Sequence, residues 1–499
     1  MSSALILSTE GTVARNGTNF GLLPFGGSAS HTKSFHDGAL SVSGDYFNMR
    51  YYYKLFPQEI HWIKEPENMI GNLMYRQKIQ QKGMLKVFAA AEHSSSVLSL
   101  EEPGTADLTR YSLQNTSGYW NAVYSQELSE LWSLRTGFSI TTDRDNIKPA
   151  EDHFTAAETD LYLKQVFSRS EHKNLSLKAG AEMNLSNYRQ TFFRRNDGLS
   201  IRQGLNGLES AVFTEGEYKI AEKISLRGGL RSEYTECNKE LNFSPRLAAA
   251  FKTSDFSQIS AAWGYSTQLP EIKYMMINSE LTNQQAIHYI VNYQWIKQNQ
   301  TFRAEIYYKN YQHLIRYDSL YAPYQYQYNS GGYGFARGID LFWRDKKTVK
   351  NSDYWLSYSY LETKRLYHDY PIAVCPPWFP AHTFSAVYKQ YFSQINIQLL
   401  SSLSAMSGRP YEDPNKEGFM NSTTPVYTDL SIGCSYVLIK KTNLYVIHAQ
   451  LTNVLGSKQI YGYRYANEPN ADGFYAFKQL RPSVKRMFIV GIFLYFNYF

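Results

Sequence analysis

Apolar and polar residues alternate one by one through many short segments of the chain. In residues 175–186, Leu, Ala and Met hold every second position, and Ser, Lys, Gly, Glu and Asn lie between them. Strict alternation is typical of a β-strand with two unlike faces. Since the polar positions are rich in Gly, Ser and charge, we expect one face to meet water and not a packed core. The same alternation occurs in residues 132–141, 225–233, 259–266, 302–309 and 429–438.

This alternation predicts which side chains face lipid and which face an aqueous lumen. The predicted lipid-facing residues are Trp132, Leu134, Phe138, Ile259, Trp263, Leu430 and Ile432. The predicted lumen-facing residues are Arg135, Lys178, Glu182, Arg227 and Glu305.

Short and long links between the predicted strands alternate as well. The short links include residues 80–83, 221–223, 297–300, 393–394 and 440–442. The long links include residues 269–283, 316–331, 367–379, 408–424 and 457–481. This pattern is typical of an outer-membrane barrel, which has tight periplasmic turns and longer extracellular loops. We therefore expect the five short links to share one rim.

Together these signals predict one closed antiparallel transmembrane β-barrel of about 22 strands. The first predicted strand is Ser2–Glu10 and the last is Pro482–Phe499, so residues 1–499 form a single barrel domain. The alternative is a soluble all-β protein such as a propeller. That alternative is disfavoured because both sheet faces would pack against protein and link lengths would have no reason to alternate.

Composition agrees with a membrane barrel. The 42 Tyr and 28 Phe suit a long boundary between water and hydrocarbon. Mean hydropathy is −0.44 because lipid-facing and lumen-facing residues cancel along each strand. The longest apolar run, Met487–Phe496, is shorter than the ~20 residues of a membrane helix. The net charge of +7 is dispersed without a basic block, which disfavours nucleic acid as a partner.

The sequence gives no support for an enzyme, a cofactor or a metal site. The segment Gly332–Gly338 has the glycines of a phosphate loop but lacks the following Lys-Ser/Thr. The eleven His and three Cys show no ligand spacing. The odd number of Cys forbids complete internal pairing, and a single bridge between two of them is the disfavoured alternative. Asp340 and Asp429 are expected to pair with Arg or Lys across the lumen face.

Several stretches in order resemble the barrel half of TonB-dependent outer-membrane receptors, particularly those of Bacteroidetes. They are NFSPRLAAAF, AAWGYSTQLPE, RAEIYYKNYQHLIRYD, NSGGYGFARGIDLFWRDKK, DYWLSYSYLETKR, SAMSGRPY and LTNVLGSKQIYGYRY, with SSALILSTE resembling the first strand. The ending MFIVGIFLYFNYF resembles the signal engaged by the barrel assembly machinery through Phe499, although Asn497 departs from that pattern.

The resemblance implies a bacterial outer-membrane protein whose lumen holds an N-terminal plug through which TonB acts. No plug, TonB-contacting segment or signal peptide precedes the first predicted strand. We expect the plug either to precede this chain in a longer product or to be a separate chain.

Clustered tyrosines mark two of the predicted extracellular loops. They could bind a chelate, sugar or peptide by stacking and hydrogen bonding, whereas the favoured alternative is an aromatic girdle at the strand ends. The candidates are Tyr321, Tyr324, Tyr326, Tyr328, Tyr461, Tyr463, Arg464 and Tyr465.

Three functions follow from these features. The first is active, TonB-dependent uptake of a siderophore, haem, cobalamin, oligosaccharide or peptide across the outer membrane. The second is a passive porin, which the strand count disfavours because porins have 16–18 strands. The third is a surface receptor that the barrel anchors in the membrane.

Overall fold

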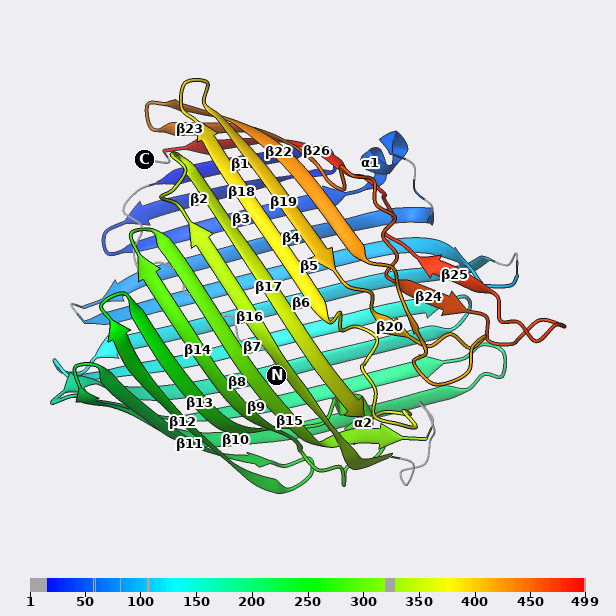
Figure 1. Ribbon diagram of the computed structural model, residues 1–499, viewed down its shortest axis with the longest axis horizontal. Helices are drawn as coiled ribbons and strands as arrows, with labels where there is room; N and C mark the ends of the chain where they lie inside the picture. The colour runs from blue at the N-terminus through cyan, green and yellow to red at the C-terminus, as the bar shows by residue number, and fades with distance from the viewer. Residues whose placement is uncertain are drawn as a thin grey trace.

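Twenty-two strands pair side by side into one antiparallel ring in the computed structural model, as predicted. The structure describes residues 16–56, 58, 60–80, 82–105, 108–318 and 328–497. The strands cross the barrel obliquely, and the front and back walls slope in opposite directions (Figure 1). Such tilt is required for a sheet to close on itself.

The strands of the ring are β1 (Gly17–Leu23), β2 (Gly26–Phe35), β3 (Gly38–Asn48), β4 (His61–Ile79), β5 (Gly83–Glu101), β6 (Leu108–Glu127), β7 (Trp132–Pro149), β8 (His153–His172), β9 (Leu175–Phe193), β10 (Ser200–Ala221), β11 (Ile224–Thr235), β12 (Glu240–Ser254), β13 (Ser257–Gln268), β14 (Gln284–Lys297), β15 (Gln300–Tyr317), β16 (Tyr328–Asp345), β17 (Ser352–Leu366), β18 (His382–Phe392), β19 (Ile397–Met406), β22 (Tyr427–Lys440), β23 (Asn443–Leu451) and β26 (Phe488–Phe496).

The ring closes between its first and last strands. β1 pairs with β2 on one side and with β26 on the other, and Phe20 lies opposite Leu494. The predicted strand Ser2–Glu10 and the C-terminal Phe499 lie outside the described residues. The last strand is shorter than expected, because β26 begins at Phe488 rather than at Pro482.

The two rims carry different kinds of links. All neighbouring strands of the ring are antiparallel, so successive links fall on alternate rims. The five short links predicted from the sequence follow β4, β10, β14, β18 and β22, which places all five on one rim. The five long links lie on the opposite rim, which we take as extracellular. The prediction of a single rim is confirmed.

The strand register confirms the predicted facing of side chains. Residues opposite each other on paired strands share a face, as do residues two apart along a strand. Following these relations around the ring places Trp132, Leu134, Phe138, Ile259, Trp263, Leu430 and Ile432 on the face of Leu22 and Ile492. Arg135, Lys178, Glu182, Arg227 and Glu305 lie on the other face.

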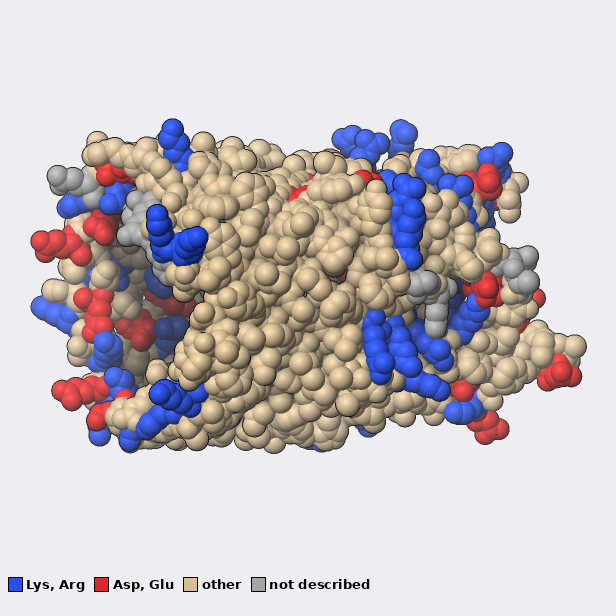
Figure 2. All heavy atoms as spheres, turned by 90° about the horizontal axis from the view of Figure 1, so that it is seen from above, with Lys and Arg blue, Asp and Glu red and all other residues tan. Residues whose placement is uncertain are grey.

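The first face is the outer one. Val291 and Ile306 lie on it, opposite each other, and are 51% and 60% exposed. The wall visible in Figure 2 carries few charged side chains in its middle, and Lys, Arg, Asp and Glu gather towards the two ends. An apolar band between charged rims is the expected surface of a barrel in a bilayer. At its periplasmic end Trp295 and Trp343 stack with ring centroids 6.0 Å apart, as in an aromatic girdle.

Lumen charges are partly paired. Arg231 bridges Glu182 and Glu233, with N–O distances of 2.8 and 2.6 Å, and Lys164 contacts Glu182 at 2.7 Å. Within the described residues neither Asp340 nor Asp429 forms an ion pair, so their expected pairing with Arg or Lys is wrong. Asp340 accepts a hydrogen bond from the Ser359 hydroxyl, and Asp429 accepts bonds from Ser431 and Gln459. These carboxylates therefore accept hydrogen bonds from neutral side chains: Ser359 on the neighbouring strand β17, Ser431 on the same strand β22, and Gln459 in the loop after β23.

The extracellular links contain small elements of their own. They are α1 (Arg50–Leu55), α2 (Ile272–Met275), the hairpin of β20 (Pro410–Tyr411) with β21 (Ser422–Thr423), and the hairpin of β24 (Gly462–Tyr465) with β25 (Phe477–Leu480). Within the described residues neither helix is long and apolar enough to cross a membrane. Cys237, Cys375 and Cys434 are unpaired in the structure.

Candidate functional site

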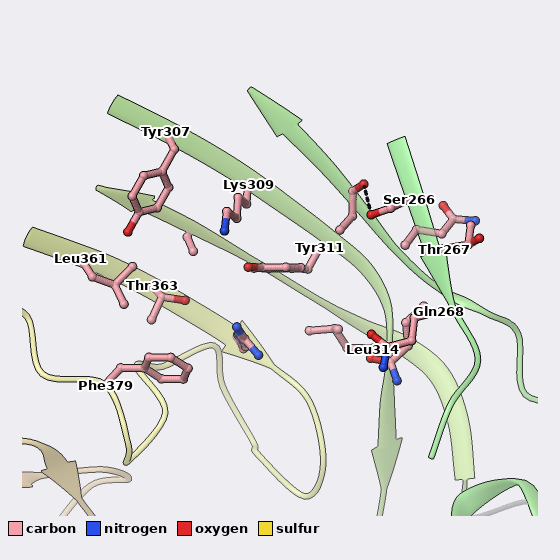
Figure 3. A pocket seen from close by; sticks show the side chains of 15 residues that line it. Ser266, Thr267, Gln268, Tyr307, Lys309, Tyr311, Leu314, Leu361, Thr363 and Phe379 are labelled. Carbon is pink, nitrogen blue, oxygen red and sulfur yellow. Dashed lines mark hydrogen bonds between the residues drawn. The ribbon is translucent and has the colours of Figure 1, made fainter. Parts of the chain in front are cut away.

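A polar cavity opens in the lumen wall beneath the long extracellular links. Its volume is about 330 Å³, and strands β13 to β17 supply most of its lining. Figure 3 shows Tyr307, Lys309 and Tyr311 in a row along one strand, facing Leu361, Thr363 and Phe379. The lining consists of Ser266, Thr267, Gln268, Gln284, Gln285, Ala286, Tyr307, Lys309, Tyr311, Leu314, Ala336, Leu361, Thr363, Arg365 and Phe379.

Strand alternation and two glycines shape this cavity. Tyr307, Lys309 and Tyr311 occupy alternate positions of β15, so all three point into the lumen. On β16, a Cβ atom at Gly338 would lie 2.5 Å from the Tyr307 hydroxyl, and one at Gly334 would lie 2.8 Å from Cγ of Arg365. These glycines therefore leave room for the two long side chains to lie across β16.

The lining carries two cations and no carboxylate. The Arg365 guanidinium lies over the Tyr311 ring at 4.7 Å and the Phe379 ring at 5.3 Å, and Lys309 Nζ lies 5.2 Å from the Tyr307 ring. Within the described residues Arg365 Nε is buried without a hydrogen-bond partner, and neither cation forms an ion pair. Cation–π contacts orient the charges without neutralising them. The wall can therefore bind an anionic group.

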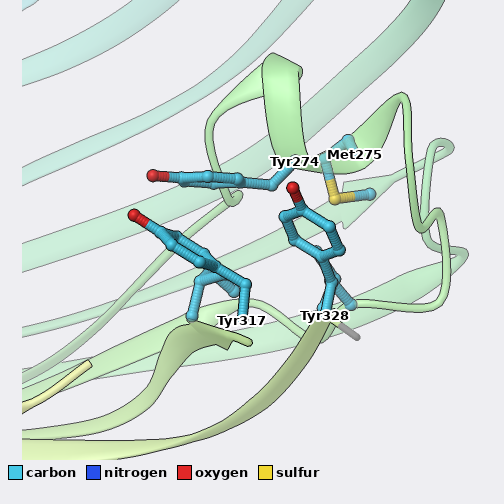
Figure 4. Close-up of a cluster of buried hydrophobic side chains, with 6 residues drawn as sticks. Tyr274, Met275, Tyr317 and Tyr328 are labelled. Carbon is cyan, nitrogen blue, oxygen red and sulfur yellow. The ribbon is translucent and has the colours of Figure 1, made fainter. Parts of the chain in front are cut away.

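A cluster of buried side chains holds the loops above the cavity. Tyr274 and Met275 of α2 pack with Tyr317 and Tyr328 from the ends of β15 and β16 (Figure 4). Burial raises the pKa of Tyr274 to about 12, so this phenol stays protonated. The Asn278 side-chain amide donates to the Tyr328 carbonyl at 3.0 Å. The cluster joins the link 269–283 to the extracellular ends of β15 and β16.

None of the predicted tyrosine-site residues that the structure describes lines this cavity. Tyr321, Tyr324 and Tyr326 lie outside the described residues. Tyr328 is 2% exposed, within the cluster of Figure 4, so it faces neither lipid nor solvent in this arrangement.

The second tyrosine loop packs against neighbouring extracellular segments. Tyr463 and Tyr465 belong to β24, outside the ring, so they do not form a girdle at barrel strand ends. Tyr463 stacks on Tyr411 at 4.6 Å, Tyr461 stacks on Tyr427 at 6.2 Å, and Arg464 pairs with Glu102. Their rings are thus partly occupied by protein contacts.

Sequence reasoning missed the lumen cavity. Its charged members lie on β15 and β17, its amide side chains on β13 and β14, and its hydroxyl side chains on β13, β15 and β17. The local sequence signal for this cavity is the alternation of Tyr307, Lys309 and Tyr311, which is also what an ordinary barrel strand shows. Among the described residues no group of three or more His, Cys, Asp or Glu is placed to hold a metal ion.

Comparison with known proteins identifies the family. The family described as "TonB dependent receptor-like, beta-barrel" matches residues 88–453. The chain belongs to this family. It is therefore a TonB-dependent receptor barrel of the outer membrane, and its closed 22-stranded ring agrees with this family. A comparison with curated sequences finds no match.

Solved structures share the fold of this TonB-dependent receptor barrel. The ferric yersiniabactin uptake receptor FyuA from Yersinia pestis has a TM-score of 0.76 at 9% identity, covering 99% of this chain and 81% of its own. The FrpB iron transporter from Neisseria meningitidis has a TM-score of 0.73 at 11% identity, covering 96% and 81%. The copper transporter OprC has a TM-score of 0.73 at 10% identity, covering 97% and 81%. At these identities the likeness shows the fold alone.

Proposed function

We propose that this barrel takes up a scarce or bulky nutrient through TonB-dependent transport, and that the ligand presents an anionic group to the cavity at Lys309 and Arg365. A plug domain would occupy the lumen, and TonB would act on that plug. The ligand classes open to this proposal are siderophore, haem, cobalamin, oligosaccharide and peptide. The iron and copper transporters among the similar structures favour a metal chelate.

The observation that best supports this proposal is that Lys309 and Arg365, at the extracellular end of the lumen, form no ion pair within the described residues. A buried guanidinium nitrogen without a partner is costly, and an incoming carboxylate, phosphate or phenolate would satisfy it. The surrounding Gln, Ser, Thr and Tyr side chains add neutral hydrogen-bonding groups. Tyr461, Tyr463, Arg464 and Tyr465 remain candidates for the first contact with a ligand at the loops.

Uptake by cells that express the full protein tests the function. A panel of labelled chelates, haem, cobalamin, oligosaccharides and peptides is offered to cells with and without a working TonB system. The proposal predicts uptake of at least one ligand that stops when TonB is removed. Uptake that persists without TonB would favour a porin, and binding without entry would favour an anchored receptor.

Variants of the cavity then test the site. Arg365→Ala is expected to weaken ligand binding about tenfold or more, since a hydrogen bond to a charged group contributes about 1.5–3 kcal/mol. Lys364→Ala is the matched control, because Lys364 is the adjacent basic residue on the outer face of β17. Equal losses in both variants would contradict the assignment of the cavity. Tyr463→Ala tests the loop candidates in the same assay.

A further inference from the structure

Five basic side chains gather on the outer face of β6 to β10 near the extracellular rim. They are Arg110, Arg144, Lys148, Arg189 and Arg202, which we call the outer basic patch. Each lies on the same face as the outward Trp120, Ile140 and Leu185, by alternation along its strand. All five are exposed.

The register places two of these arginines on either side of a small residue. Ala157 of β8 lies opposite Arg144 of β7 and opposite Arg189 of β9, and Arg189 in turn lies opposite Gly204 of β10. Two strand spacings separate the arginine backbones by roughly 10 Å. Because Ala157 and Gly204 have small side chains, they leave a shallow recess between Arg144 and Arg189 and on the far side of Arg189. Arg202 lies opposite Thr191, one row further out.

The patch lies just above the apolar band. Along these strands one outward row consists of Trp120, Ile140, Leu161, Leu185 and Leu208. The next row outward is Gly118, Thr142, Thr159, Asn187 and Asn206, and the arginine row follows. Four residues of a tilted strand rise roughly 10 Å along the membrane normal, which places Arg144 and Arg189 at the headgroup level of the outer leaflet.

The acidic side chains that the structure describes leave the patch without a neutralising partner. Within the described residues none of its five members forms an ion pair. The acids next to them in sequence, Asp143 and Asp145, point into the lumen, where the Asn115 amide donates to both. Arg337, an outward arginine on β16, differs because it pairs with Glu362 at 2.8 Å.

We propose that the outer basic patch binds the phosphate of an outer-leaflet lipid headgroup. The height fits a membrane lipid, the recess between two arginines fits a tetrahedral anion, and the acyl chains would lie on the apolar rows below. Guanidinium groups bind phosphate with paired hydrogen bonds, and basic residues at a membrane surface attract anionic lipids. This proposal is independent of the transported ligand.

The test measures lipids that remain with the full protein. The protein is placed in nanodiscs of phosphatidylcholine containing a minority of phosphatidic acid, then extracted gently, and the bound lipids are counted by native mass spectrometry. Arg144→Gln with Arg189→Gln removes the central pair. Arg337→Gln with Glu362→Gln is the matched control on another wall. Heat-modifiable mobility on gels confirms that each variant is folded.

The wild type and the control are expected to retain phosphatidic acid above its bulk proportion. In the Arg144→Gln, Arg189→Gln double variant this enrichment is expected to be at least tenfold lower. Equal enrichment in the double variant would overturn the proposal. So would full displacement of the lipid by millimolar inorganic phosphate at constant ionic strength, since that result would indicate a site for a soluble anion.

Discussion

The outer and inner faces of the ring use the same strands but meet different solvents. On β14, Val291 faces lipid, and its neighbour Asn292 faces the lumen, where the Ser260 hydroxyl donates to the side-chain oxygen Oδ1 of Asn292 at 2.8 Å. On β11, Leu230 faces lipid and Arg231 joins an ion network with Glu182 and Glu233. Adjacent residues of a strand therefore face hydrocarbon and a hydrated interior in turn. The cost of a charged substitution in folding free energy should differ strongly between two such neighbours.

The largest expected difference in folding stability is between the variants Val291→Arg and Asn292→Arg. Val291 lies in the middle of β14 and is half exposed on the outer face, so an arginine there should cost about 2–4 kcal/mol of folding stability. Asn292→Arg should cost less than about 1 kcal/mol, because the lumen can hydrate the charge. Denaturant unfolding in lipid vesicles measures both. Similar costs at the two positions would mean that the faces are not separated as described.

Two arginines on β11 sharpen the description of the lumen. Arg231 is one-quarter exposed between Glu182 and Glu233, whereas Arg227 is about half exposed beside Glu217. Arg231→Met should cost about 1–2 kcal/mol, since it leaves two partly buried carboxylates close together. Arg227→Met should cost less than about 1 kcal/mol, as is usual for an exposed pair. If both losses in unfolding free energy are equally small, the network is fully hydrated.

The sequence predicted the faces well because alternation is a local property of a strand. Trp132, Ile259 and Ile432 could be assigned to lipid from their immediate neighbours, and the short links could be assigned to one rim from their order. The cavity could not be predicted in this way. Lys309 and Arg365 meet only because β15, β16 and β17 pair in a particular register, with Gly334 and Gly338 leaving the space between them.

The missed ion partners have the same origin. Arg231 meets Glu182 only through the registers of β9, β10 and β11, and Asp340 meets a serine rather than a cation through the register of β16 with β17. A shift of one residue in the pairing of two strands would bring a different polar side chain next to each of these charged groups.

The smallest expected effect concerns His368 in the link between β17 and β18, outside the membrane. Its ring lies 5.3 Å from the Tyr317 ring, and its Nε2 lies 3.4 Å from the Tyr274 hydroxyl. Burial is the main reason that the pKa of His368 is lowered, and nearby Lys273 and Arg365 lower it further, whereas Glu271 and Asp369 act in the opposite direction. The folded loops therefore favour the neutral imidazole.

A lowered folded pKa means that His368 contributes its stability above the ordinary pKa of about 6.5 and loses it as the pH falls below that value. We expect hydrogen exchange, corrected for intrinsic rates, to increase between pH 7.5 and pH 5.5 in residues 272–281 and 367–374. The strands of the ring should not respond, because their backbone bonds do not depend on this ring. His368→Phe keeps an aromatic ring but cannot be protonated, so it should abolish the response. An unchanged pH response in that variant would assign the effect to another group and leave the loop cluster without a titrating member.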